Sequence, residues 1–555
     1  MKRLLLLLSL LAAPALFGAG THRYIVVTTP AARETTRLRT LSMVSGANER
    51  NVHPFESIDG FAVDLTDEEA AAMQKSAGVR SVSRTIAVHA VDDVQPSHMR
   101  PRPAGGPLAA MQVVPPNIDV VHAREVWPLT RGGNVNVVVF DTGVDFAHAD
   151  LTANIAGGYN IFTKTADIND DNFHGTHVSG IIGAIDNNLG VVGVAPGAHI
   201  YMVKVLDKNG TGTDEGVVDA ADWVIAMKHA RGGNWIISMS LGSIGASDPE
   251  AAAFQRLTDE GVLSIAAAGN DGWNQLLYPA ALPDVVSVGA VDNDKVIAEF
   301  SNSSPTLNLV APGVSILSTL PTGSVRRAAT TLADNTDVPS VPVTGAPLSE
   351  VTGQWVFCNY GAPGDFPPET NGRIAVMMRG MSLPFSDKVR NARAAGAIGA
   401  VLINDNAVTT DANWTLIKYV CDNAGCKDDP ADLSYSWPVV VAMSGSDGAK
   451  LIAGAKGQTL TISAWLDDYG IHSGTSMATP HVTGVAALVW SLAPSATAKQ
   501  VANALRASAT DVGPPGIDNT YGFGCVDALA AAKWLAPAAF GLPPRPELRQ
   551  RGVRP

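Results

Sequence analysis

Short apolar runs that alternate with helical segments are the strongest constraint on the fold of this 555-residue chain. From about residue 118 the chain contains VNVVVF, HIYMVKVL, NWIISMSL, GVLSIAAA and VVSVGAV, separated by segments such as TDEGVVDAADWVIAMKHARG. Unbroken runs rich in β-branched residues, alternating with helices, are typical of a parallel sheet that is covered on both faces. We therefore expect an α/β fold with a doubly wound parallel sheet and helices on both faces.

Polar residues that could act in catalysis or binding follow these runs. In such a sheet, functional residues lie just beyond the carboxyl ends of the strands. Asp141 comes directly after VNVVVF, and a carboxylate at the end of a buried strand must accept hydrogen bonds to offset its burial. About thirty residues later, His174 and His177 stand in HGTHVSG. These imidazoles could be a metal pair, core histidines or a catalytic base. Zinc is disfavoured, because a third ligand or the His-Glu-x-x-His form is missing.

Ser476 stands at the start of a third feature, the segment SGTSMATPH followed by VTGVAALVWSL. The apolar run predicts a buried helix, and Pro480 falls where a first helical turn can accept it. The positive end of that helix would favour anionic charge developing at the serine. Taken alone, Ser476 reads as an ordinary N-cap, so its significance depends on Asp141 and His174.

Together, DTGVD, HGTHVSG and GTSMATPHV resemble the three active-site signatures of the subtilisin-like serine peptidases, in the order aspartate, histidine, serine. The order separates the chain from α/β-hydrolases. The resemblance implies that Ser476 attacks a peptide carbonyl, His174 acts as the base and Asp141 orients the imidazole. His177, one turn later, is expected to be a packed neighbour.

Two further segments resemble the substrate cleft of that family. Asn270 follows GVLSIAAAG and is expected to donate its amide to the oxyanion beside the Ser476 backbone N–H, although an isolated Gly-Asn is usually a loop cap. Residues Ser240, Leu241 and Gly242 resemble the segment that pairs with the substrate backbone and lines the first specificity pocket. Extended peptide would then bind by strand addition.

A structural calcium ion is the cofactor implied by the resemblance; no catalytic cofactor is expected. The implied ligands are carboxylate, amide and backbone oxygens, which suit a hard cation: Asp150, Ile185, Asn187, Leu189 and Val191. Without the resemblance, the segment from Asp186 to Asn188 reads equally well as a plain turn.

The N-terminal region predicts export and an inhibited precursor. Residues 1–19 have the charged start and short apolar run of a signal peptide, with a retained anchor as the alternative. We expect a secreted protein, extracellular or periplasmic, without a membrane span after signal removal. Residues 20–92 predict a β-α-β-α-β unit that resembles an inhibitor-type propeptide, through YIVV and AGVRSV. The Pro/Gly-rich linker 93–117 is the expected site of maturation cleavage.

An insertion interrupts the expected catalytic domain, which we place at 118–320 and 468–537, before a Pro/Arg-rich tail at 538–555. Residues 321–467 are too many for a structureless connection. GRIAVMMRGMSLPFSDKVRNARAAGAIGAVLIND resembles the protease-associated (PA) domain. The four cysteines (Cys358, Cys421, Cys426 and Cys525) leave the disulfide pairing open.

These features predict a secreted serine endopeptidase that hydrolyses protein or peptide substrates and has its own propeptide as an intramolecular inhibitor. The net charge of −13 carries no basic cluster, which argues against a nucleic-acid partner. Two alternatives are a catalytically inactive subtilase-fold binding protein that works through its PA domain, and a dedicated processing protease with narrow specificity.

Overall fold

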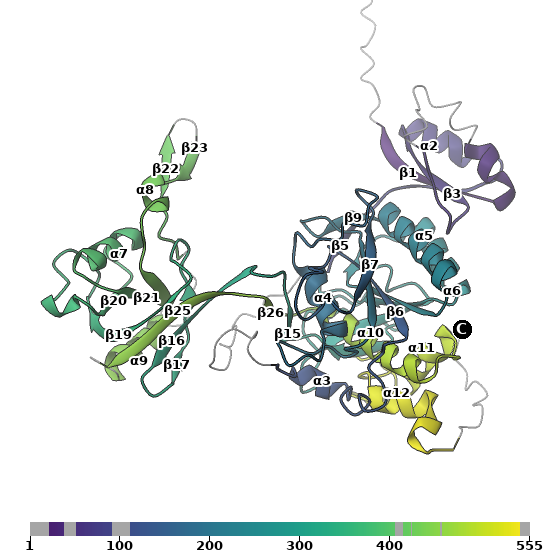
Figure 1. Cartoon of the computed structure of the whole chain (residues 1–555). Helices are drawn as coiled ribbons and strands as arrows, with labels where there is room; N and C mark the ends of the chain where they lie inside the picture. Colours follow the sequence, from purple (N-terminus) through teal and green to yellow (C-terminus); the bar gives the residue numbers. More distant parts are fainter. Residues whose placement is uncertain are drawn as a thin grey trace, which may run out of the picture.

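Three units make up the chain in the computed structural model, which describes residues 21–37, 52–91, 112–405, 414–422, 425–454 and 458–543 (Figure 1). The expected signal peptide at 1–19, linker residues 93–111 and tail residues 544–555 lie outside the described residues. Within the described part, no helix is long and apolar enough to cross a membrane.

A seven-stranded parallel sheet forms the centre of the catalytic unit, with strand order β14-β13-β12-β10-β6-β8-β7. Its strands are β6 (Val135–Asp141), β7 (Ile155–Asn160), β8 (His199–Lys204), β10 (Asn234–Met239), β12 (Leu263–Ala267), β13 (Val285–Val291) and β14 (Leu309–Pro312). The parallel order confirms the fold class expected from the apolar runs.

Alternate residues of each central strand enter two different cores. In β6, Val137 and Val139 pack into the core beneath α4 and α10, whereas Val138 and Phe140 pack into the core beneath α5 and α6. The helices of the catalytic unit are α3 (Pro116–Val120), α4 (His174–Gly183), α5 (Asp214–Arg231), α6 (Asp248–Asp259), α10 (Thr475–Leu492), α11 (Ala498–Ala507) and α12 (Ala528–Leu535). Both faces are therefore covered, as strands that are apolar on both sides require.

Helix α10 runs through the first of these cores and is buried along nearly its whole length. It begins at Thr475, so Pro480 lies inside the helix and not in its first turn, contrary to the prediction. A proline at this position cannot donate to the carbonyl of Ser476, four residues earlier. Ser240 Oγ takes that place and donates to Ser476 O at 2.8 Å. The nucleophile candidate and the cleft segment are therefore joined directly.

The N-terminal unit is a four-stranded antiparallel sheet, in the order β2-β3-β1-β4, with helix α2 packed on it. It contains β1 (His22–Thr28), β2 (His53–Pro54), β3 (Gly60–Leu65), α2 (Asp67–Gln74) and β4 (Val79–Arg84). Thr66 and Glu69 form a capping box at α2. The last strand expected here divides in two, because β5 (Ala87–Ala90) leaves the unit and pairs with the catalytic unit.

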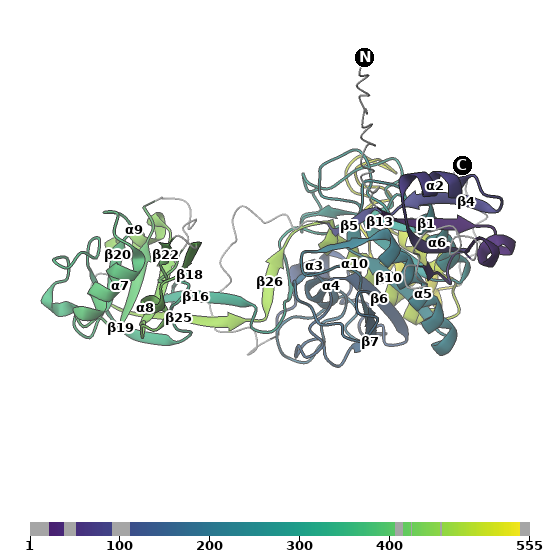
Figure 2. The same cartoon turned by 90° about the horizontal axis from the view of Figure 1, so that it is seen from above.

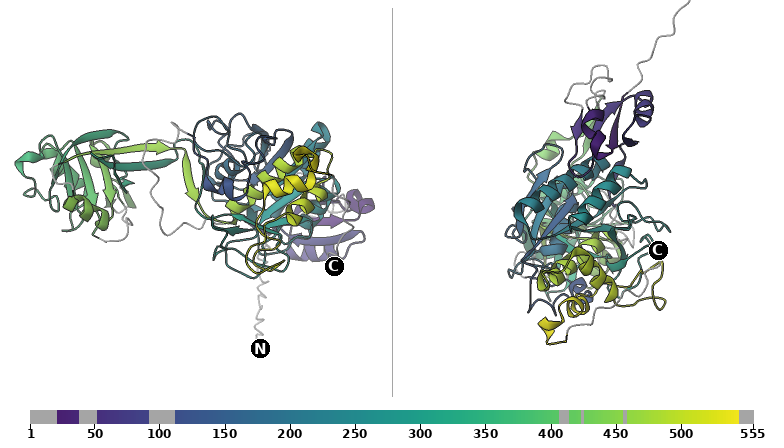
Figure 3. Two further views of the ribbon diagram at one scale, coloured as in Figure 1. Left: turned by 90° about the horizontal axis from the view of Figure 1, so that it is seen from below. Right: turned by 90° about the vertical axis from the view of Figure 1, so that its right-hand side faces the viewer.

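The insertion folds as a separate domain around an eight-stranded sheet, in the order β17-β16-β25-β19-β20-β21-β24-β18. Its elements are β16 (Val325–Leu332), β17 (Asp337–Val338), β18 (Val341–Pro342), β19 (Glu350–Phe357), β20 (Ile374–Met378), α7 (Phe385–Ala394), β21 (Gly399–Ile403), β22 (Tyr419–Asp422), β23 (Gly425–Asp428), α8 (Pro430–Leu433), β24 (Val439–Met443), α9 (Gly445–Gly454) and β25 (Thr459–Asp467). Strands β15 (Ile316–Thr319) and β26 (Tyr469–His472) pair where the chain leaves and re-enters the catalytic unit. The inserted domain and the N-terminal unit lie at opposite ends of the catalytic unit (Figures 2 and 3).

The cysteines divide into two groups. Cys358 and Cys525 are buried free thiols. Cys421 and Cys426 are opposite each other in the backbone register of the β22–β23 hairpin.

Candidate active site

Asp141 and His174 are brought together by the end of β6 and the start of α4. The Nδ1 atom of His174 lies 2.8 Å from Asp141 Oδ1 and 3.0 Å from Oδ2. Asp141 Oδ1 also accepts a hydrogen bond of 2.7 Å from the Thr142 N–H, and both side chains are buried. This bond places the proton of a neutral His174 on Nδ1, which leaves Nε2 as the basic nitrogen.

Asp170 fixes the distance between these two residues and was missed by the sequence analysis. Its Oδ1 accepts from Thr142 Oγ1 at 2.9 Å, and its Oδ2 accepts from Thr176 Oγ1 at 2.6 Å and Thr176 N at 2.9 Å. Burial raises the pKa of Asp170, although these bonds oppose the rise. Because the carboxylate ties the end of β6 to the first turn of α4, Asp170 is a positioning residue for the Asp141–His174 pair.

Ser476 lies in the first turn of α10, which packs against α4. Its Oγ donates to the carbonyl oxygen of Val91 at 3.0 Å and lies 3.3 Å from Ser240 O. Val91 is the last described residue before the linker. The serine hydroxyl therefore contacts a peptide carbonyl of the chain's own N-terminal region.

The segment from Ala87 to Val91 lies in the cleft as an added strand. Strand β5 pairs antiparallel with β9 (Thr211–Thr213) on one side and with β11 (Leu241–Gly242) on the other. Leu241 is opposite Ala90, Gly242 is opposite His89, and Val91 N donates to Ser240 O at 3.1 Å. All three residues predicted to bind substrate backbone thus contact an extended segment.

Asn270 lines the same cleft, after the end of β12. Its Oδ1 accepts hydrogen bonds of 2.8 Å from both the backbone N–H and the hydroxyl of Thr475. These bonds orient the amide so that its donor end, Nδ2, is directed away from Thr475. Asn270 and the N-terminal turn of α10 are therefore held together beside Ser476.

His177 and His481, two further histidines near this centre, are buried in the core. His177 Nε2 lies 3.2 Å from Gly470 O, and burial lowers the pKa of His177 well below its ordinary value. His481 lies between Asn117 Nδ2, at 2.6 Å, and Met477 O, at 2.7 Å. Burial lowers the pKa of His481 to about 4. Both rings are neutral at pH 7 and have structural contacts.

The residues expected to bind calcium form one compact loop site. Asp150 is fully buried, and its Oδ2 accepts from Val191 N at 2.8 Å and from Tyr469 Oη at 2.9 Å, whereas its Oδ1 has no hydrogen-bond partner. Burial raises the pKa of Asp150. Gln112, not predicted from the sequence, places its amide 2.9 Å from Ile185 O and 3.4 Å from Val191 O.

Two members of the expected ligand set are bonded to each other in this loop. The Leu189 N–H donates to Asn187 Oδ1 at 2.9 Å, and Asn187 is tied to Ala149 O at 3.3 Å. In the described part of the chain, no three His, Cys, Asp or Glu side chains cluster as metal ligands. A cation here would depend on carbonyl and amide oxygens around the single carboxylate of Asp150.

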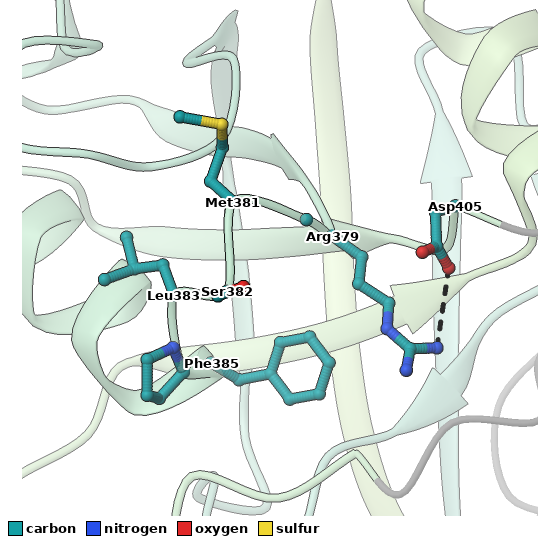
Figure 4. Close-up of a pocket in the computed structure, with 8 residues that line it drawn as sticks. Arg379, Met381, Ser382, Leu383, Phe385 and Asp405 are labelled. Atoms are coloured by element: carbon teal, nitrogen blue, oxygen red, sulfur yellow. Dashed lines mark ion pairs between the residues drawn. The ribbon is translucent and has the colours of Figure 1, made fainter.

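A separate cavity of about 380 Å³ lies in the inserted domain, lined by Arg379, Gly380, Met381, Ser382, Leu383, Pro384, Phe385 and Asp405. Arg379 Nη1 is 3.5 Å from Asp405 Oδ1 and 3.1 Å from Asn404 Oδ1. The Phe385 ring and the Arg379 guanidinium extend toward each other, whereas Met381 points away (Figure 4). The charged lining residues are paired with each other, and the described lining contains no base beside Ser382.

Comparison with known proteins identifies both large units. The model of the subtilase family matches residues 132–337 and 397–524, and the PA domain model matches residues 333–451. The thermostable alkaline protease of Halalkalibacterium halodurans is 32% identical over 310 residues, which cover 56% of this chain and 77% of that protein. Subtilisin DY of Bacillus licheniformis is 37% identical over 240 residues, which cover 42% of this chain and 83% of that protein.

A solved structure of a subtilisin-like protease is also similar to this chain. The crystal structure of the psychrophilic subtilisin-like protease Apa1 from the Antarctic psychrotroph Pseudoalteromonas sp. AS-11 is similar, with a TM-score of 0.51 and 33% identity, over 77% of this chain and 99% of that chain. The chain therefore belongs to the subtilase family of serine peptidases, with a PA domain inserted in its catalytic unit.

Proposed function

We propose that this peptidase is exported and hydrolyses protein or peptide substrates through Asp141, His174 and Ser476. One observation carries the proposal: Ser476 Oγ lies 3.0 Å from the carbonyl oxygen of Val91, in a segment held as a strand in the cleft. The bonded Asp141–His174 pair at the adjacent helix supplies the base that a serine nucleophile needs.

The reaction proceeds in two halves. Ser476 Oγ attacks the peptide carbonyl carbon while His174 Nε2 accepts its proton, and Asp141 stabilises the imidazolium. The Ser476 N–H and the Asn270 amide stabilise the tetrahedral oxyanion. His174 then protonates the leaving amine as the C–N bond breaks, and water hydrolyses the acyl-enzyme by the same route.

The N-terminal unit acts as a propeptide that blocks the cleft. Arg23 forms two hydrogen bonds with Glu215, of 2.7 and 2.9 Å, and His53 lies 2.5 Å from Asp219. These contacts attach the unit to α5 while β5 occupies the substrate position. The maturation bond is then the one between Val91 and Asp92, at the start of the linker.

A structural calcium ion fits the Asp150 loop. The buried, unpartnered Oδ1 of Asp150 is an acceptor that a cation would satisfy. The carbonyls of Ile185, Leu189 and Val191 and the side chain of Asn187 would complete the ligand set. Gln112 would join it only after its amide turns over, because Nε2 is the atom that faces the Ile185 and Val191 carbonyls. The ion would fix this loop and has no part in the reaction.

Replacing the nucleophile tests the proposal. Ser476→Ala should reduce hydrolysis of an unstructured protein by about 10⁶-fold and leave the precursor uncut. Ser473→Ala is the matched control, because Ser473 lies just before α10, three residues from Ser476, and accepts a hydrogen bond from Ser315 N. The control should hydrolyse normally. Persistent hydrolysis by purified Ser476→Ala protein, or an inactive mature wild type, would refute the proposal.

A further inference from the structure

We propose that Leu277 closes the pocket that receives the side chain preceding the scissile bond, and so restricts this peptidase to small and medium aliphatic residues there. The inference rests on the proposed function, because it uses Val91 as the residue that occupies this pocket. It adds a specificity-determining residue outside the segments that pair with substrate backbone.

Val91 is held in this position by its backbone on both sides. Its N–H donates to Ser240 O at 3.1 Å, and its carbonyl oxygen accepts from Ser476 Oγ at 3.0 Å. Its side chain is only 4% exposed and packs in an apolar cluster with Ala267 and Leu277. The valine side chain is therefore directed into a pocket beside the nucleophile.

Leu277 fills the space between the two backbone segments that bound this pocket. A Cβ added to Gly242 would lie 2.8 Å from Leu277 Cβ, and a Cβ added to Gly269 would lie 2.9 Å from Leu277 Cγ. The leucine thus packs closely against glycines of both segments. A larger side chain from the substrate would have to displace it.

The position of Leu277 is also fixed by its backbone. Leu277 N donates to Ala268 O at 3.0 Å, and the next residue, Tyr278, exchanges two hydrogen bonds of 2.9 Å with Ser243. These bonds connect Leu277 to both pocket walls. Because close-packed interiors do not shift readily, the leucine acts as a fixed floor and does not move aside for a bulky residue.

Peptide profiling of the mature enzyme tests this floor. The wild type should cleave peptides with Val before the scissile bond at least roughly tenfold more efficiently, in kcat/KM, than peptides with Phe, since pocket fit is worth about that much. Leu277→Ala should raise the Phe-to-Val ratio by a similar factor. Leu276→Ala is the matched control, because Leu276 is also buried but packs in a different cluster. It should leave the ratio unchanged.

Self-processing of the full chain gives a second readout. Val91→Phe should slow conversion of the precursor at the bond after residue 91, and adding Leu277→Ala should restore it. Equal processing of Val91→Phe and wild type, or a Phe-to-Val ratio that Leu277→Ala does not change, would overturn the inference. Neither result would affect the nucleophile assignment, which only continued hydrolysis by Ser476→Ala would refute.

Discussion

The N-terminal unit and the inserted domain are both small attachments to the catalytic unit, but they contact it in opposite ways. The N-terminal unit covers α5 and sends β5 into the substrate cleft. Charged groups complete this contact, as Asp222 accepts from the N–H groups of Glu56 and Ser57. Under the proposed function, this position makes it a competitor for substrate.

The inserted domain is joined through strand connections beside β15 and β26. Arg327 donates to Tyr469 O at 3.0 Å, and Thr322 N donates to Asp145 Oδ2 at 2.9 Å, close to the points where the chain enters and leaves. Its body stands away from the catalytic unit (Figure 2). One attachment therefore occupies the cleft beside Ser476 through β5, whereas the contacts described for the other lie at the strands that connect it to the catalytic unit.

The largest expected effect tests whether the chemistry belongs to the catalytic unit alone. Asp141→Asn should lower kcat for a short peptide by about 10⁴-fold, because the His174 tautomer is no longer fixed. Arg379→Ala, in the cavity of the inserted domain, should leave hydrolysis of the same peptide unchanged. A tenfold loss with Arg379→Ala would show that the inserted domain takes part in the reaction and would contradict the assignment of the chemistry to the catalytic unit alone.

Removal of calcium should separate the stabilities of the two units. Gln112 and Tyr469, which flank the Asp150 loop, belong to the catalytic unit, so chelator should destabilise that unit by about 4 kcal/mol if the ion was present at a thousand times its Kd. Calorimetry of Ser476→Ala protein would measure the lower Tm without self-digestion. The transition of the inserted domain should not move. Asp150→Asn should abolish the chelator effect, and a chelator-insensitive wild type would contradict the calcium proposal.

Acid should destabilise the catalytic unit before the inserted domain, because residues 321–467 contain no histidine. Burial lowers the pKa of His481 from 6.5 to about 4, so folding favours the neutral ring. Its contribution is fully present above pH 6.5 and is lost as pH falls toward 4, on the order of 3 kcal/mol. Thermal unfolding of Ser476→Ala protein between pH 7 and 4.5 would measure this loss.

His481→Gln should reduce the slope of that pH dependence without abolishing it, because glutamine does not titrate and the buried His177 still does. An unchanged slope in this variant would assign the acid sensitivity to other groups. Loss of the inserted domain's transition at the higher pH would contradict the expected order of unfolding.

The smallest expected effect concerns attachment of the propeptide. Arg23→Ala removes a part-buried bidentate ion pair with Glu215 and should weaken inhibition by about 10- to 30-fold. The strength of inhibition can be measured from the lag between cleavage of the precursor and full activity, which should be shorter in Arg23→Ala. Arg33→Ala is the control, because the partners of Arg33, the Phe55 carbonyl and the exposed Glu56, both lie within the N-terminal unit and not on α5. Equal lags for both variants would argue that β5 alone holds the propeptide.

The sequence predicted the features that are encoded locally. Apolar runs around β6 and β10 gave the parallel sheet, and residues directly after strands or at helix starts gave Asp141, His174 and Ser476 as candidates. The roles of Asp170 and Gln112 could not be predicted, because each depends on partners from other segments. Leu277 follows no motif, and only the fold places it against Gly242 and Gly269.

The prediction that Pro480 lies in the first turn of the helix was wrong for a related reason. Helix α10 extends five residues before the proline, since a side chain from another segment, Ser240, replaces the missing backbone donor. Similarly, β5 was predicted to belong to the last strand of the N-terminal unit, but it pairs with β9 and β11 of the catalytic unit instead. Tertiary contacts decide such boundaries, and a single sequence does not show them.

The path of β5 has a second consequence beyond filling the cleft: the length of this segment sets which residue reaches Ser476. Between the sheet of the N-terminal unit, which ends at Arg84, and the hydroxyl of Ser476, the chain crosses the gap with a set number of residues in a set register. One additional residue in this span would bring Ala90 to the nucleophile and turn Val91 out of its pocket. If the proposed maturation bond after Val91 is the one cut, the length of this segment and the fit of one side chain together set the first residue of the mature enzyme.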